Sequence, residues 1–136
     1  MYLYNFLYNK NINKKKMNVL KIIFLGESNT RKTSIISQYI KESFIKEYST
    51  TISSNIIQKE IEIENKKLII ELYDIPGNKQ YRDNIKILIK NINIALLVYD
   101  ITNNISFNEL NYWYNQINEI NGKNNIFIVV IENKND

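Results

Sequence analysis

One short stretch of the chain places a glycine, a lysine and a threonine at a spacing suited to phosphate binding. Residues 26–33 are Gly-Glu-Ser-Asn-Thr-Arg-Lys-Thr, and an apolar run precedes them. Loop amides and a helix N-terminus can bind an anion, a lysine adds positive charge, and a threonine hydroxyl can bind Mg²⁺. The stretch therefore predicts a phosphate-binding loop between a strand and a helix.

The phosphate-loop pattern is incomplete at one position. In G-x-x-x-x-G-K-[ST], the second glycine is replaced here by Arg31. Glycine lets the backbone approach a phosphate closely, whereas a long side chain there can clash with the ligand. An ordinary strand-to-helix turn that carries Gly26 and Lys32 by chance is the alternative interpretation, and the rest of the chain must decide between them.

The elements around this loop follow from hydrophobic patterning. Leu20–Leu25 is an apolar, β-branched run that predicts a buried strand, and Lys32–Ile40 has the apolar spacing of a helix. Ile56–Glu64 alternates apolar and polar residues, as a half-exposed strand does. A turn at Asn65-Lys66 then leads into a returning strand at Leu68–Tyr73, so a hairpin at a sheet edge is expected.

The second half of the chain continues the alternation of strands and helices. We expect a short helix at Tyr81–Lys90, a strand buried on both faces at Ile94–Tyr99, and another strand at Asn125–Ile131. Between these strands, Ser106 and Glu109 form a potential capping box that begins a helix. The expected apolar stripe of that helix is Phe107, Leu110, Tyr114, Ile117 and Ile120. The order predicts an α/β fold with a mainly parallel sheet and helices on both faces, with polar loops at the carboxyl ends of the strands.

Composition limits the possible chemistry. The 136 residues are 44% hydrophobic and 24% charged, which suits one globular domain. Cysteine and histidine are absent, so disulfides, thiolate catalysis, histidine triads, zinc hydrolase sites and cysteine prenylation are excluded for this sequence. The net charge of +4 is mild, and nothing further supports nucleic-acid binding.

The first residues differ in character from the rest. We expect residues 1–16 to be a disordered N-terminal extension, with an aromatic, lysine-flanked membrane-surface anchor as the alternative. Lys14, Lys15 and Lys16 are the one dense basic run, most simply a solvated tract. No apolar run is long enough to predict a transmembrane segment.

Three later motifs give the chain a resemblance to a known family. They are Leu97-Val98-Tyr99-Asp100-Ile101-Thr102, Ser106-Phe107 with Leu110 and Trp113, and Asn133-Lys134-x-Asp136. Together with residues 26–33, their order and spacing resemble the Ras superfamily of small GTPases, most closely the Rab family, from Leu20 to Asp136. The resemblance implies a P-loop NTPase-like fold lacking the last strand and helix, with residues 17–136 as a partial small-GTPase domain.

The resemblance also implies a site for GTP or GDP with Mg²⁺. It assigns phosphate binding to the loop residues Gly26, Ser28, Asn29, Thr30, Arg31, Lys32, Thr33 and Ser34. The expected metal-binding residues are Thr33, Thr51 and Asp74, where Thr51 also closes on the γ-phosphate and Gly77 offers its amide to it. For Thr51, an ordinary exposed loop residue is the alternative interpretation.

The remaining implied contacts select the base. Phe44 is expected to stack on guanine, although it could equally be a core aromatic, and Tyr48 is a further nucleotide contact. Asn133 and Lys134 would brace the pocket, while the carboxylate of Asp136 would accept hydrogen bonds from guanine, a donor pair that adenine lacks.

Several residues depart from the family pattern besides Arg31. Asn78 replaces the glutamine that orients the attacking water, and it is one methylene shorter. Pro76 stiffens a loop that should switch, and Lys79 reverses the usual charge. Residues 53–55 depart from the Rab effector signature.

These features lead to one leading hypothesis and two alternatives. The leading hypothesis is a Rab-like GTP/GDP switch of vesicle trafficking with weakened or slow GTP hydrolysis, cytoplasmic and peripheral on endomembranes. Effectors, exchange factors or GTPase-activating proteins would bind through residues 46–56 and 75–84. The alternatives are a nucleotide-free pseudo-GTPase that acts as an interaction module, and an inactive fragment.

Overall fold

The computed structural model describes residues 19–41, 55–122 and 125–134. In chain order the elements are β1 (Val19–Leu25), α2 (Lys32–Lys41), β2 (Asn55–Ile63), β3 (Lys66–Asp74), the 3₁₀ turn η1 (Lys79–Tyr81), α3 (Arg82–Ile89), β4 (Ile94–Asp100), α4 (Asn104–Asn121) and β5 (Phe127–Asn133). The five-stranded sheet has the order β2-β3-β1-β4-β5. Only the β2–β3 pair is antiparallel in this sheet, so the expected mainly parallel sheet is confirmed.

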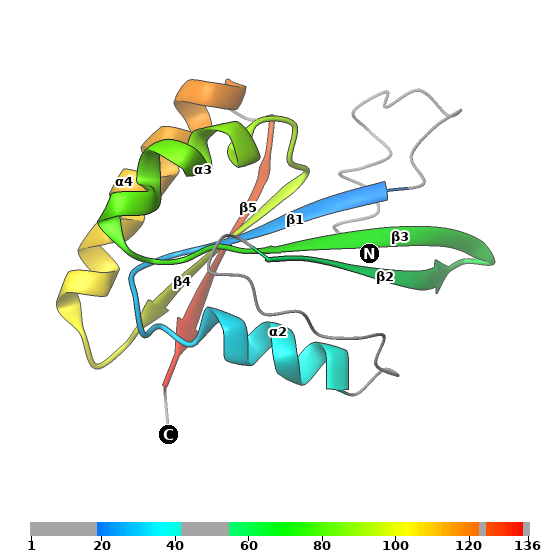
Figure 1. Ribbon diagram of the computed structural model, residues 1–136, viewed down its shortest axis with the longest axis horizontal. Coiled ribbons are helices and arrows are strands. Elements are labelled where there is room, and N and C mark those ends of the chain that lie inside the picture. Colours follow the sequence, from blue (N-terminus) through cyan, green and yellow to red (C-terminus); the bar gives the residue numbers. More distant parts are fainter. Residues whose placement is uncertain (1–18, 42–54, 123–124, 135–136) are drawn as a thin grey trace.

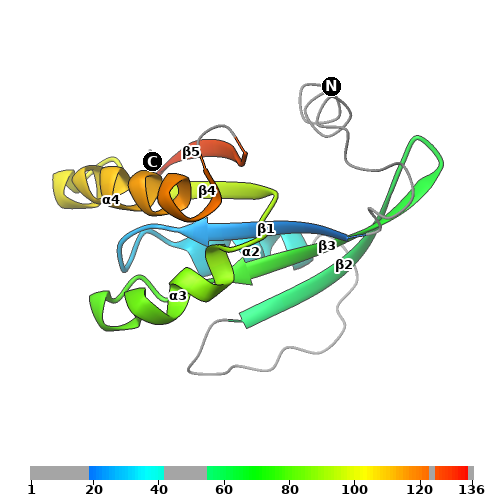
Figure 2. The same cartoon turned by 90° about the horizontal axis from the view of Figure 1, so that it is seen from above.

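Helices cover both faces of the sheet, as the alternating sequence predicted. Figure 1 shows α3 and α4 side by side on one face and α2 on the other. The β2–β3 hairpin forms one edge, and Figure 2 shows it extending past the start of β1. Its two-residue turn is Glu64-Asn65, both with positive φ, one residue earlier than predicted. Positive φ at both central residues is the turn geometry that matches strand twist.

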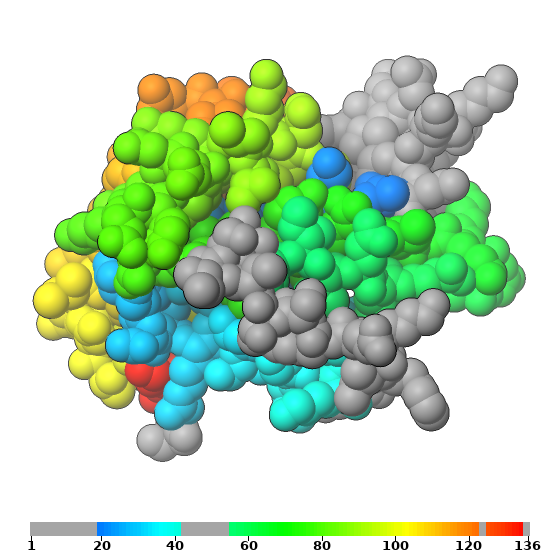
Figure 3. All heavy atoms as spheres, in the orientation of Figure 1, coloured from blue at the N-terminus to red at the C-terminus, as the bar shows by residue number. Residues whose placement is uncertain are grey.

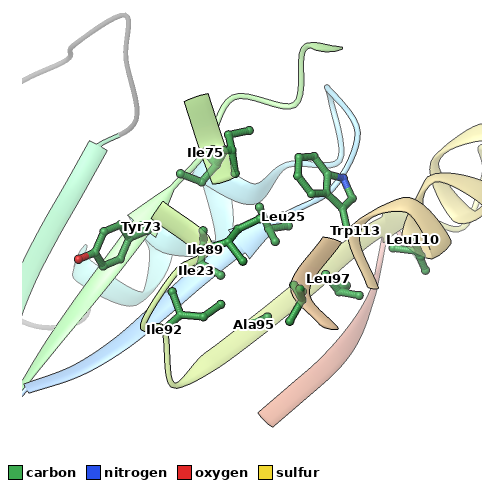
Figure 4. Close-up of a cluster of buried hydrophobic side chains, with 12 residues drawn as sticks. Ile23, Leu25, Tyr73, Ile75, Ile89, Ile92, Ala95, Leu97, Leu110 and Trp113 are labelled. Atoms are coloured by element: carbon green, nitrogen blue, oxygen red, sulfur yellow. The ribbon is translucent and has the colours of Figure 1, made fainter. Parts of the chain in front are cut away.

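The larger core cluster lies between the sheet and the α3–α4 layer. Figure 4 shows Leu110 and Trp113 of α4 and Ile89 of α3 against the strand residues Leu25 and Leu97. Trp113 is only 1% exposed, so this layer is anchored by one large aromatic side chain. A smaller cluster around Ile36 of α2, which is fully buried, covers the opposite face. Both layers position the loops at the carboxyl edge of the sheet.

The structure corrects the expected start of α4. Asn103, not Ser106, is the N-cap, because its side chain accepts a hydrogen bond from the backbone N–H of Ile105. Ser106 is buried, and its hydroxyl donates to the Asn103 carbonyl at 2.7 Å and accepts from the backbone N–H of Asp100 at 2.9 Å. Asn is as good a cap as Ser, and placing it here lets Ser106 tie the helix to the end of β4.

The expected apolar stripe of α4 is confirmed at Leu110 and Ile117 but is wrong at Phe107 and Tyr114. Leu110, Trp113 and Ile117 are buried, whereas Phe107 and Tyr114 are 55% and 51% exposed. Trp113 takes the core position because it and Leu110 are three residues apart and share a helix face with Ile117. Phe107 instead makes an edge-to-face ring contact with Tyr99 at 5.2 Å.

Candidate nucleotide site

The candidate site lies where the parallel strands end. The register aligns Phe24 with Asp74 and Asp100 with Asn133, so the last residues of β3, β4 and β5 lie at the same edge as the loop after β1. Ligands of open α/β sheets bind beyond these carboxyl ends. In Figure 3 the blue atoms of the loop after β1 lie between the green atoms of α3 and the red atoms of β5.

The loop after β1 contains three residues with positive φ. Gly26 has φ +150°, and a Cβ there would lie 2.1 Å from the carbonyl oxygen of Val98, so only glycine fits. Asn29 and Arg31 adopt left-handed φ values of 63° and 64°. Arg31 therefore occupies the conformation that the missing glycine would favour, with its side chain exposed to solvent.

Lys32 is folded back over the loop. It is only 6% exposed, and its Nζ donates to the carbonyl oxygens of Gly26 at 2.9 Å and Glu27 at 2.8 Å. Burial lowers the pKa of Lys32 to about 8, although the charges of Asp74 and Glu27 oppose this shift. A phosphate entering the loop would meet a positive charge that the protein has already desolvated.

Thr33 and Asp74 form the part of the site suited to a metal. The hydroxyl of Thr33 donates to Oδ2 of Asp74 at 2.7 Å, so the two predicted ligands meet although they come from different elements. Within the described ranges no cluster of three or more His, Cys, Asp or Glu residues surrounds them. Mg²⁺ keeps several waters and takes phosphate oxygens as ligands, so one hydroxyl and one carboxylate are a fitting protein contribution.

The segment after β3 packs directly on the loop. A Cβ on Gly77 would lie 2.3 Å from the backbone nitrogen of Ser28, so glycine is required for this approach. The hydroxyl of Ser28 donates to Oδ1 of Asn78 at 2.7 Å. Asn78, which stands at the expected water-positioning site, is thereby held on the loop.

The end of β5 braces the loop from the other side. Nδ2 of Asn133 donates to the carbonyl oxygen of Thr30 at 2.8 Å. Lys134, with φ 64°, donates through Nζ to Oδ2 of Asp100 at 2.6 Å. Asp100 also accepts from the hydroxyl of Thr102, and these bonds, first the one from Lys134, lower the pKa of Asp100 to about 2. Asn133 is thus tied to the loop after β1 and Lys134 to the end of β4, and their role in bracing a nucleotide pocket stays a prediction.

Two adjoining hollows border these residues. The larger is an open cleft of about 820 Å³, within the range of small-ligand sites. Its described lining includes Ser28, Asn29, Arg31, Lys32, Thr33, Ser34, Asp74, Gly77, Asn78 and Lys134. The second, of about 460 Å³, is bordered by Arg31, Ser34 and Asn133 together with α2 residues.

Most predicted site residues are therefore brought together at one edge of the sheet. The predicted residues Phe44, Tyr48, Thr51 and Asp136 lie outside the described residues. Sequence reasoning gave no role to Asp100 and Glu27. Asp100 was recognisable as the polar residue that ends a buried strand, whereas Glu27 becomes notable only through its contacts with distant residues.

Comparisons with known proteins agree with this geometry. The fold is that of a P-loop NTPase-like domain, and the Ras family model matches residues 21–136. The chain belongs to the Ras family. Over 99 residues it is 37% identical to the GTP-binding protein yptV5 of Volvox carteri and 35% identical to the GTP-binding protein YPTC5 of Chlamydomonas reinhardtii. Over 99 residues it is also 35% identical to the Ypt/Rab-type GTPase ypt7 of Schizosaccharomyces pombe.

These alignments cover different shares of the proteins. Each includes 73% of this chain and 48% of the relative, so the chain spans about half the length of the curated relatives it matches. The resemblance to Rab-type members of the family is confirmed by these matches. None of the helices in the described ranges is both long and apolar enough to span a membrane.

Proposed function

We propose that this protein binds GTP and GDP with Mg²⁺ and acts as a Rab-type switch in vesicle trafficking, on the cytoplasmic surface of endomembranes. The observation that carries the proposal is the convergence of Lys32, the Thr33–Asp74 pair and Asn133 on one loop. Together they offer a charge for phosphate, ligands for a metal and a brace between the loop and β5. The names of the relatives support guanine nucleotides as the ligand.

Titration with mant-GDP in the presence of magnesium tests binding. We expect saturation at micromolar protein, displacement by GTP but not by ATP, and loss of binding in Lys32→Ala. Lys86→Ala is the matched control, because Lys86 is exposed on α3 and its only ion-pair partner in the described part of the chain is nearby Asp83. Failure of the folded protein to bind at these concentrations would reject the proposal.

We further propose that GTP hydrolysis is slow. The side chain of Asn78 is shorter than the family's glutamine, and its amide oxygen already accepts a hydrogen bond from the Ser28 hydroxyl. In single-turnover assays Asn78→Gln should hydrolyse GTP faster, by up to about 100-fold, the cost of misplacing a reacting group by roughly 1 Å. A wild-type rate equal to that of Asn78→Gln would contradict this reasoning.

One observation favours the second candidate, a nucleotide-free interaction module. The side chains of Lys32, Thr33 and Ser28 all have hydrogen-bond partners within the site, so these three side chains do not need a ligand as a partner. In that case the protein would purify without nucleotide and fail the titration while still unfolding cooperatively. Nucleotide retained through purification would exclude it.

A further inference from the structure

A cluster of opposite charges lies between the phosphate loop and α4, outside the nucleotide cleft. Nη2 of Arg82, the first residue of α3, forms an ion pair with Oε2 of Glu109 in α4 and lies 3.9 Å from Oε2 of Glu27 in the loop. Nζ of Lys79 lies 3.5 Å from the other Glu109 oxygen. One guanidinium therefore joins three separate segments of the chain.

Three members of the cluster are largely withdrawn from water, whereas the side chain of Lys79 is 69% exposed. The side chains of Arg82, Glu27 and Glu109 are only 15%, 19% and 17% exposed. The Arg82 guanidinium carbon lies 4.1 Å from the ring centroid of Tyr112 and 5.5 Å from that of Trp113. Stacking on aromatic faces and pairing in low dielectric are interactions that suit arginine better than lysine.

Glu27 depends on this arginine. Its Oε1 accepts the backbone N–H of Ser28 at 3.2 Å, but its Oε2 is buried and has no hydrogen-bond partner among the described residues. Burying a charged carboxylate oxygen without a partner costs free energy, and the nearby positive charge of Arg82 offsets part of this cost for Glu27. The loop and the segment after β3 are thus joined twice, through Ser28–Asn78 and through Glu27–Arg82.

We propose that Arg82 is a positioning residue that holds the phosphate loop closed through Glu27, anchored from behind by Glu109. The inference rests on the proposed nucleotide binding and adds a control on nucleotide release. A nucleotide leaves when the loop opens, and opening separates Glu27 from Arg82. In Figure 3 the loop, α3 and the start of α4 meet on one face, in blue, green and yellow.

The test is the rate at which mant-GDP is released into excess GDP. Arg82→Ala should release mant-GDP about tenfold faster than the wild type, and Glu109→Gln about threefold faster. The effect of Glu109→Gln is informative because Glu109 lines neither hollow and, among the described residues, forms ion pairs only with Arg82 and Lys79. Because both substitutions act through one contact, Arg82→Ala/Glu109→Gln should release no faster than Arg82→Ala alone. Arg82→Lys should be intermediate, and Lys86→Ala should match the wild type.

The outcomes separate this proposal from its alternatives. A faster release in Arg82→Ala with no change in Glu109→Gln and Glu27→Gln would overturn it, because Arg82 would then act without these partners. Lower unfolding midpoints with unchanged release rates would also overturn it, since they indicate a structural role alone. If the wild type binds no nucleotide, the proposed function fails, and hydrogen exchange at residues 27–31 still tests the contact. Exchange that is not faster in Arg82→Ala would then reject the positioning role.

Discussion

Replacing Arg31 by glycine should stabilise the protein. Arg31 has φ 64°, a left-handed conformation that costs a residue with a Cβ about 1–2 kcal/mol. Glycine removes this cost but adds about 0.5–1 kcal/mol of backbone entropy to be lost on folding. The net expectation is a gain of about 0.5–1 kcal/mol, which for a domain of this size corresponds to a rise in Tm of about 2–4 °C.

Asn29→Gly is the matched control for this substitution. Asn29 lies in the same loop and has nearly the same φ, 63°, but asparagine tolerates the left-handed region better than arginine. Its replacement should therefore change the free energy of unfolding by less than about 0.5 kcal/mol. Both variants are compared with the wild type by urea and thermal unfolding without nucleotide or magnesium.

Equal gains in the two variants would refute the reasoning, because the benefit would then not depend on the side chain that is strained. A loss of stability in Arg31→Gly would refute it more directly, since it would mean that the guanidinium makes a net favourable contribution. The same proteins also report on the ligand site. Because Arg31 lines both hollows, mant-GDP should bind Arg31→Gly more tightly than the wild type.

Three further predictions concern the site and the core. Without nucleotide or magnesium, Lys32 has a pKa of about 8 when folded and 10.5 when unfolded, so the unfolded chain binds more protons between these pH values and stability should rise with pH there. The free energy of unfolding should increase by about 3 kcal/mol over the whole of this pH range. Urea unfolding at pH 7 and 10 should show most of this increase in the wild type but not in Lys32→Met. Gly77→Ala should cost about 1–3 kcal/mol, because its Cβ would meet the backbone of Ser28; mant-GDP affinity should fall with it, and an unchanged affinity would contradict the close approach. Trp113→Ala should cost about 3–5 kcal/mol in urea unfolding, since the side chain is fully buried; a smaller loss would mean that the core collapses onto the cavity.

Local patterns were enough to predict most elements of the fold. The buried runs that became β1 and β4 and the alternating hairpin strands depend on side-chain periodicity within the segment itself. Element ends were less accurate, as at β5, which runs from Phe127 to Asn133 rather than over residues 125–131. The predicted start of α4 was wrong because Asn103 and Ser106 are both good N-caps. In the structure Asn103 caps Ile105, while the Ser106 hydroxyl is used by the backbone N–H of Asp100.

Some residues of the site could also be predicted from local sequence, and others could not. Gly26, Lys32 and Thr33 could be recognised from spacing because loop, charge and hydroxyl are all supplied within eight consecutive residues. The roles of Glu27, Arg82 and Glu109 could not be recognised, since each is an ordinary surface charge until the fold brings them together.

That difference has a functional consequence for this chain. The residues that would touch a nucleotide are set by a local motif, whereas the contacts that hold the motif in place come from α3, α4 and β5. Substitutions in these supporting elements should therefore change how long a nucleotide stays more than which nucleotide binds. Arg82 is the sharpest case, because its guanidinium contacts the loop through one carboxylate and α4 through another.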